Sequence, residues 1–124
     1  MEKYSPSDVL AAILYFFPAA RFVNDKEKIQ TELAKVRQKH NKLLACFLFR
    51  QHQLYPHSEI LLGALSSLMP EFLQMDGDYS EYIIQKDRLK LLWQKDLRKM
   101  FSSKGEELRQ IARQFCKSLK EKQP

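Results

Sequence analysis

Glycine and cysteine are scarce in this chain of 124 residues, and long apolar runs are absent. Three glycines are too few for the glycine-rich loops that cradle phosphates in nucleotide-binding enzymes. The two cysteines, Cys46 and Cys116, cannot form a disulfide framework, so we expect buried free thiols in a reducing, cytoplasmic environment. The longest apolar stretch runs from Val9 to Ala20, which is too short to span a bilayer, and we expect no membrane association.

Positive charge exceeds negative charge, with 21 Lys and Arg against 15 Asp and Glu, which gives a net charge of +6. Hydrophobic residues make up 44% of the chain and charged residues 29%, a balance typical of a folded domain rather than a disordered one. This length predicts a single domain over residues 1–124, large enough to enclose one hydrophobic core.

The first predicted helix begins after Ser5, which is expected to act as its cap, and ends at Pro18. Asp8 lies in the first turn, at the positive end of the helix dipole. Aromatic residues at positions 15 and 16 widen the apolar surface, so we expect this helix at the centre of the core. The apolar residues that recur at helical spacing are Val9, Leu10, Ile13, Leu14 and Phe17.

A second helix is predicted after a capping box formed by Asn24 and Glu27. Its buried stripe consists of Ile29, Leu33 and Val36. Residues 43–50 are ambiguous, because a short apolar run fits both a continuation of this helix and a buried strand. The run from Ala45 to Phe49 favours a strand or an extended link.

A third helix is predicted between Tyr55 and Met69. Its buried residues are expected to be Leu61, Leu65 and Leu68. The clearest strand signal follows, because apolar runs at 72–75 and 79–84 flank Asp76-Gly77-Asp78. Asp-Gly between apolar runs is typical of a β-hairpin, since glycine accepts the positive φ that such turns demand.

Two further helices are predicted over residues 87–119, with Asp87 capping the first and Ser103 and Glu106 forming a capping box for the second. The tail 120–124 has nothing to pack against and is expected to fray. The apolar stripe of the last helix is Leu108, Ile111, Ala112, Phe115 and Leu119. The predicted fold class is therefore α+β and mostly helical, with about five helices and one small β-hairpin.

The predicted order of elements over residues 7–86 is helix, helix, strand candidate, helix and β-hairpin. This order resembles that of winged-helix domains, a variant of the helix-turn-helix with a hairpin wing after the third helix. The resemblance implies that the third helix enters the major groove of duplex DNA. Helices that follow the wing often mediate pairing in such proteins, so the resemblance also implies a homodimer through the C-terminal helices.

Several residues depart from what this resemblance implies. The outward positions of the third helix carry no Arg or Lys, and the wing from Glu71 to Tyr82 holds four acids and no base. Because a duplex backbone repels such a wing, DNA contact is expected on basic helix faces elsewhere. The candidate phosphate-binding residues are Lys35, Arg37, Lys39, Lys42, Lys95, Arg98 and Lys99.

No arrangement of side chains predicts a catalytic site, a cofactor or a metal. Cys46, His52 and His57 have no local fourth ligand, which structural zinc usually requires. Asp76 and Asp78 are explained by turn formation, and both cysteines lie in apolar surroundings that disfavour a thiolate. The single Trp93 fits the apolar stripe of the fourth helix, which favours packing over base stacking.

We therefore expect a small, non-catalytic DNA-associated protein, a transcriptional regulator that uses basic helix faces. The alternative is a protein-interaction or dimerisation module that binds no nucleic acid, for which the neutral third helix and the acidic wing argue. The resemblance to winged-helix domains favours the first of these, although fold alone does not determine function.

Overall fold

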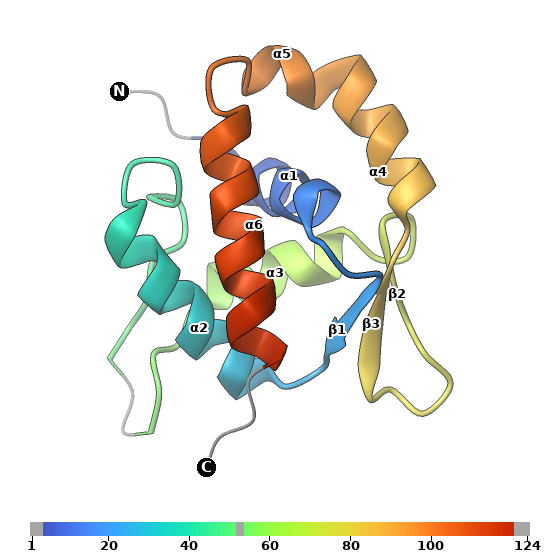
Figure 1. The fold of residues 1–124 in the computed structure, drawn as a ribbon. Coiled ribbons are helices and arrows are strands. Elements are labelled where there is room, and N and C mark those ends of the chain that lie inside the picture. Colours follow the sequence, from blue (N-terminus) through green and yellow to red (C-terminus); the bar gives the residue numbers. More distant parts are fainter. Residues whose placement is uncertain (1–3, 52–53, 121–124) are drawn as a thin grey trace.

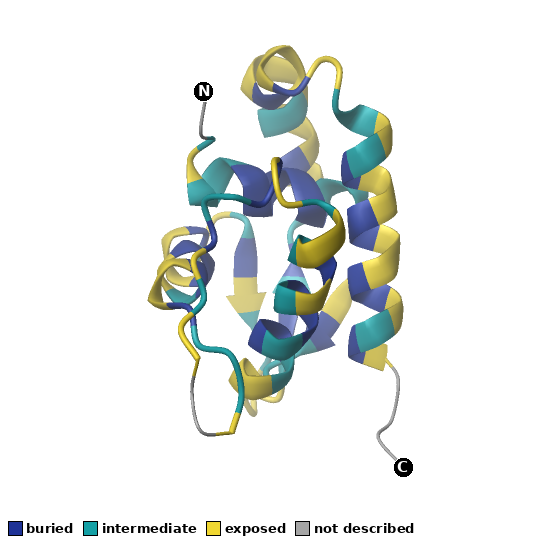
Figure 2. Cartoon of the chain, turned by 90° about the vertical axis from the view of Figure 1, so that its left-hand side faces the viewer, coloured by how far each residue is buried: buried dark blue, intermediate teal, exposed yellow. Residues whose placement is uncertain are grey.

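The computed structural model describes residues 4–51 and 54–120, and it confirms a mostly helical α+β fold (Figure 1). The helical elements are α1 (Pro6–Phe16), α2 (Lys26–Lys39), α3 (Glu59–Ser67), α4 (Lys86–Leu92), the π-helical turn η1 (Trp93–Leu97), α5 (Arg98–Met100) and α6 (Gly105–Lys120). The strands are β1 (Arg21–Val23), β2 (Leu73–Met75) and β3 (Glu81–Ile84). Figure 2 shows buried positions on the inward sides of the helices and exposed positions on their outer sides.

Helix α1 lies at the centre of the core, as its apolar surface predicts. Every residue from Val9 to Leu14 is buried, because α3, α4 and α6 each pack against a different part of it. A helix that is apolar on most sides must be enclosed in this way to keep its surface out of water. Pro6 occupies the first turn as expected, but the Ser5 side chain makes no capping hydrogen bond.

The expected β-hairpin is confirmed by the antiparallel pairing of β2 with β3. A third strand, β1, pairs with the other side of β3, so the sheet order is β1-β3-β2. This strand was not predicted, because three residues are too short to show an alternating pattern. Stacking of Phe22 on Tyr82, with ring centroids 5.0 Å apart, supports the pairing across the β1–β3 ladder.

Residues 43–50 form no strand and do not continue α2, and the extended link that was the other expectation is found over 47–50. The chain makes a series of turns over 41–46 and then runs extended to an isolated bridge between Arg50 and His57. The three buried apolar side chains in this segment are Leu43, Leu44 and Phe47. Burial of these side chains without a regular ladder explains why the apolar run alone suggested a strand.

A buried glutamine of α2, Gln30, holds the end of this connection at the start of α3. The Gln30 Oε1 accepts a hydrogen bond from the Ser58 backbone N–H at 2.8 Å, and its Nε2 donates to the Lys26 carbonyl. Ser58 in turn caps α3, because its Oγ accepts from the Leu61 N–H. Helix α3 therefore begins at Glu59 rather than near Tyr55, and a long connection separates it from α2, which packs chiefly against α6.

Three expected helix starts are displaced by one or two residues. Asp25 rather than Asn24 caps α2, because its carboxylate accepts from the Lys28 N–H while Asn24 donates to the Tyr79 carbonyl in the hairpin. Gln85 precedes α4, so the predicted cap Asp87 lies inside the helix. The Lys104 carbonyl accepts from the Leu108 N–H, which places the start of α6 after 104 and not at Ser103.

The hairpin turn differs from its sequence signature. Gly77 does not adopt positive φ, and the residue in the left-handed region is Tyr79, with φ of 61°. The Asp76 carboxylate holds this turn by accepting from the Ser80 N–H, the Ser80 Oγ and the Glu81 N–H. Hydrogen bonds from Ser80 lower the pKa of Asp78, with a smaller contribution from Asp76. Both aspartates therefore serve the turn, as expected.

Residues 86–100 form an interrupted helix, called here the 86–100 arm, where a single helix was predicted. Its first part is α4, its middle is the π-helical turn η1, and α5 ends it. Leu89 and Leu97 are its fully buried residues, which places one edge of the arm against α1. A π-helical turn holds one residue more than an α-helical turn. The spacing of Leu89 and Leu97 therefore differs from the regular α-helical spacing on which the prediction was based.

Lys86 closes the C-terminal end of α1. Its Nζ donates to the carbonyl oxygens of Leu14 at 2.8 Å, Phe17 at 2.5 Å and Tyr15 at 3.4 Å. The last turn of α1 holds no basic residue of its own, so this lysine supplies the cation that the negative end of the helix dipole favours. Burial lowers the pKa of Lys86, and the nearby Cys116 opposes this effect.

We expect Lys86→Met to lower the free energy of unfolding by about 1–3 kcal/mol, because it removes the charged donor to the carbonyls of Leu14, Tyr15 and Phe17 at the end of α1. The matched control is Lys90→Met in the same helix, where the side chain is exposed and little change is expected. Urea denaturation of both variants measures the effect. Equal loss of stability in the two variants would contradict the capping role of Lys86.

Candidate nucleic-acid interface

The four predicted phosphate-binding residues near the end of α2 do not all remain available. Lys35 forms an ion pair with Glu32, with Nζ and Oε1 3.2 Å apart. Arg37 is half-buried and donates from Nε to the Leu44 carbonyl at 3.2 Å. Lys39 and Lys42 are exposed. The structure thus assigns Arg37 a role in holding the 41–46 turns, which the sequence did not indicate.

The second predicted group, Lys95, Arg98 and Lys99, lies exposed on η1 and α5. Figure 1 shows α2, which carries most of the first group, beside α6, and α5, which carries Arg98 and Lys99, near the N-terminal end of α6.

Helix α6 carries a row of exposed cations that was not singled out from the sequence. Arg109, Arg113, Lys117 and Lys120, called here the α6 stripe, are all exposed. Their spacing of three or four residues places them along one face of the helix over about 16 Å. The signal was present in the sequence, because the stripe lies at the positions left over by the buried residues from Leu108 to Leu119.

A partly exposed aromatic cluster lies beside the α6 stripe. It consists of Tyr15 and Phe16 at the end of α1 and Trp93 at the start of η1. Trp93 stacks on Tyr15 with centroids 5.1 Å apart and meets the Phe16 ring edge-on at 4.9 Å. The Arg109 guanidinium lies 5.3 Å from the centroid of Phe16, which joins the stripe to the cluster.

Two other aromatic side chains of the hairpin and of the turn before α6 offer no surface for base stacking. Tyr82 and Phe101 are buried, at 3% and 1% exposure. Trp93, by contrast, packs on α1 and remains partly exposed.

Helix α3 and the hairpin remain poor candidates for DNA contact. The exposed residues of α3 are Glu59, Ile60, Gly63, Ser66 and Ser67. The exposed tip of the hairpin carries Asp78, and its base carries Glu71, with no Lys or Arg from 71 to 82. The exposed cations described above therefore lie outside the two elements that winged-helix domains use.

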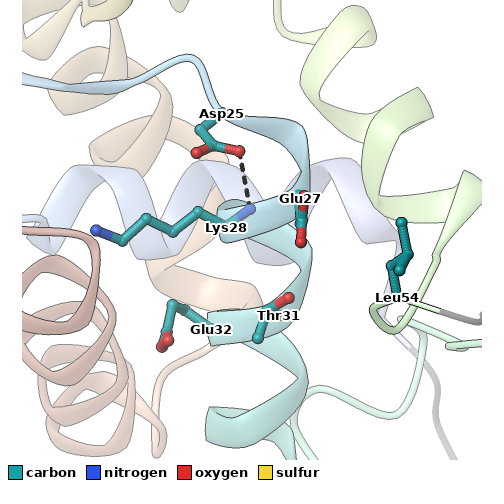
Figure 3. A pocket seen from close by; sticks show the side chains of 6 residues that line it. All are labelled: Asp25, Glu27, Lys28, Thr31, Glu32 and Leu54. Atoms are coloured by element: carbon teal, nitrogen blue, oxygen red, sulfur yellow. Dashed lines mark hydrogen bonds between the residues drawn. The ribbon is translucent and has the colours of Figure 1, made fainter. Parts of the chain in front are cut away.

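Two of the hollows on the described surface lie beside residues considered above. The first, of about 500 Å³, lies between α2 and the exposed Leu54 and is polar (Figure 3). Asp25 in its wall is already engaged as the cap of α2, and Glu32 pairs with Lys35. The second, of about 200 Å³, lies at the far end of the α6 stripe beside Lys120, over an apolar lining that includes Phe22.

The residues considered for chemistry are dispersed or already engaged. Among the described residues, no group of three or more His, Cys, Asp and Glu side chains is placed to hold a metal, and His52 lies outside them. Cys116 is buried, and this burial raises the pKa of its thiol although Lys120 and Lys86 act in the opposite direction. Across 4–51 and 54–120, no helix is long and apolar enough to cross a membrane.

We expect Cys116 to react slowly with thiol reagents, because a buried thiol of raised pKa supplies little thiolate. In the Cys46→Ser variant, alkylation of Cys116 by iodoacetamide should be at least about tenfold slower in the folded protein than in urea. Mass spectrometry follows the reaction, and Cys116→Ser reports the half-buried Cys46 as the matched control. A folded Cys116 that reacts as fast as the unfolded one would contradict this prediction.

Comparisons of the chain with protein-family models, with curated proteins and with solved structures found no match. The charge and geometry described above therefore provide the basis for a functional proposal.

Proposed function

We propose that this protein is a non-catalytic DNA-associated protein that contacts phosphates through basic helix faces, in the manner of a small regulator of transcription. The observation that carries the proposal is the α6 stripe, whose four cations are exposed along one helix face. Cations on a rigid helix can neutralise several phosphates at once and release their counterions, which is the main source of sequence-independent affinity.

Other exposed cations lie on neighbouring elements. Lys95, Arg98 and Lys99 add charge on the 86–100 arm, while Lys39 and Lys42 add it at the end of α2. Lys35 and Arg37 contribute less, because each is engaged within the chain. The proposed mode thus differs from the one that the winged-helix resemblance implies, since it places phosphate contacts on α6 and its neighbours instead of on α3 and the hairpin.

The proposal predicts binding that weakens steeply with salt. Four phosphate contacts give a slope of about −3 to −4 when the logarithm of the association constant is plotted against the logarithm of the salt concentration. Mobility-shift or anisotropy titrations of a labelled 20-base DNA measure it. The double variant Arg113→Ala with Lys117→Ala should reduce the slope by about two and weaken binding.

A charge-preserving control separates electrostatics from folding. The double variant Arg113→Lys with Lys117→Arg keeps both cations, so it should keep the slope of the unaltered protein. Absence of DNA binding at low salt, for single strands and duplexes alike, would overturn the proposed function.

A second candidate function, a dimerisation or protein-interaction module, rests on exposed apolar residues of the 86–100 arm. Leu91 is 62% exposed and Met100 is 41% exposed. The apolar stripe of α6 is buried within its own chain, so pairing through the C-terminal helices would have to use the arm.

This second candidate predicts a molar mass that rises with protein concentration in light scattering. Leu91→Glu should remove the rise, because it places a charge in the contact that the apolar side chain would make. A monomeric mass at every concentration would exclude a homodimer.

A further inference from the structure

We infer that the DNA bound by the α6 stripe is single-stranded, with its phosphates along the stripe and its bases against the aromatic cluster of Tyr15, Phe16 and Trp93. This inference rests on the proposed function and specifies which form of DNA the same surface selects. It follows from the position of the aromatic cluster relative to the cations.

The cations and the aromatic rings form one surface. Arg109 belongs to the α6 stripe and at the same time lies over the Phe16 ring, 5.3 Å from its centroid. Phe16 contacts Trp93 edge-on, which carries the aromatic surface from α1 to η1. Figure 1 shows the end of α1 between α6 and α4, so this cluster lies between two helices that both carry exposed cations.

Aromatic rings beside cations distinguish single strands from duplexes. In a duplex the faces of the bases are covered by their neighbours, and a protein surface meets mainly phosphates and groove edges. In a single strand the bases are free to stack on aromatic side chains or on an arginine plane, while the phosphates follow a basic surface. Arg109 lies over Phe16, and Phe16 in turn meets Trp93, so a cation and two aromatic rings lie next to one another.

The elements that a duplex would use carry the wrong charge. The exposed face of α3 holds Glu59 and no cation, and the hairpin holds acids that repel a second phosphate backbone. A flexible single strand can follow α6 without approaching either element. A duplex is wider and stiffer than a single strand, so it is harder to place along α6 without bringing its phosphates near the acidic hairpin.

The far end of the α6 stripe offers a second contact. The hollow of about 200 Å³ beside Lys120 is lined by the mostly buried Phe17, Phe22 and Leu119 and by the ion pair of Arg21 with Glu81. The Arg21–Glu81 contact, at 3.6 Å, joins two half-exposed groups that a phosphate can displace. A phosphate of a strand that follows the stripe could therefore be held by Arg21 and Lys120 at this end.

The test compares a fluorescein-labelled oligo(dT) of 20 bases with a 20-base-pair duplex carrying the same label. We expect anisotropy titrations at matched salt to show at least about tenfold tighter binding of oligo(dT), the gain expected from one stacked base. Trp93 is the one tryptophan of the chain, so its fluorescence should be quenched when oligo(dT) binds.

Variants of Trp93 assign the preference to the aromatic cluster. Trp93→Leu should lower affinity for oligo(dT) about tenfold and leave affinity for the duplex unchanged, while Trp93→Phe, which keeps a ring, should retain most of the preference. If Trp93→Leu fails to fold, the fluorescence quenching and Trp93→Phe still test the inference. Tyr79→Asn removes an exposed aromatic residue of the hairpin, at a position whose positive φ asparagine tolerates, and should change neither affinity.

The outcomes separate this inference from the proposed function. Equal or tighter binding of the duplex, or a preference that Trp93→Leu leaves intact, would overturn the single-strand inference and leave DNA binding in place. Failure of both DNAs to bind at low salt would overturn both.

Discussion

The enclosure of α1 is the constraint on which the rest of the structure depends. A helix with six consecutive buried residues, from Val9 to Leu14, needs neighbours on every side, and α3, α4 and α6 provide them. The end of this helix creates a second requirement, because the last carbonyl groups of a helix have no partner within it and need donors. Lys86 meets that requirement from the start of α4 and thereby determines where the 86–100 arm leaves the sheet.

The sequence pattern predicted the elements that rest on long periodic runs and failed where structure depends on distant contacts. Helix α6 and the β2–β3 hairpin were predicted because periodicity and turn residues are local signals. Strand β1 escaped prediction because it is stabilised by pairing with β3, about sixty residues later in the chain. For residues 43–50 only the extended link was predicted correctly, because the apolar side chains of the first half fill the core from turns, and the π-helical turn η1 leaves no mark in an apolar pattern.

The candidate site, too, could be predicted only in part from the sequence. That lysines and arginines would lie on exposed helix faces could be predicted, and Lys39, Lys95, Arg98 and Lys99 do so, while Lys42 is exposed in the turns after α2. The engagement of Arg37 with a backbone carbonyl could not, because it depends on how the following turns fold back. The α6 stripe was accessible from spacing alone, but its meaning depends on which aromatic residues lie beside it, and that is a property of the tertiary structure.

The hydrogen bonds from Lys86 have a consequence for how this surface meets a ligand. They anchor the start of the arm to the end of α1, immediately beside Tyr15 and a few residues before Trp93. Swinging the arm outward would strip the α1 carbonyls of their donor, so the aromatic rings are held in position before any ligand arrives. A surface that is already organised loses little conformational entropy on binding, and it should associate without a slow rearrangement step.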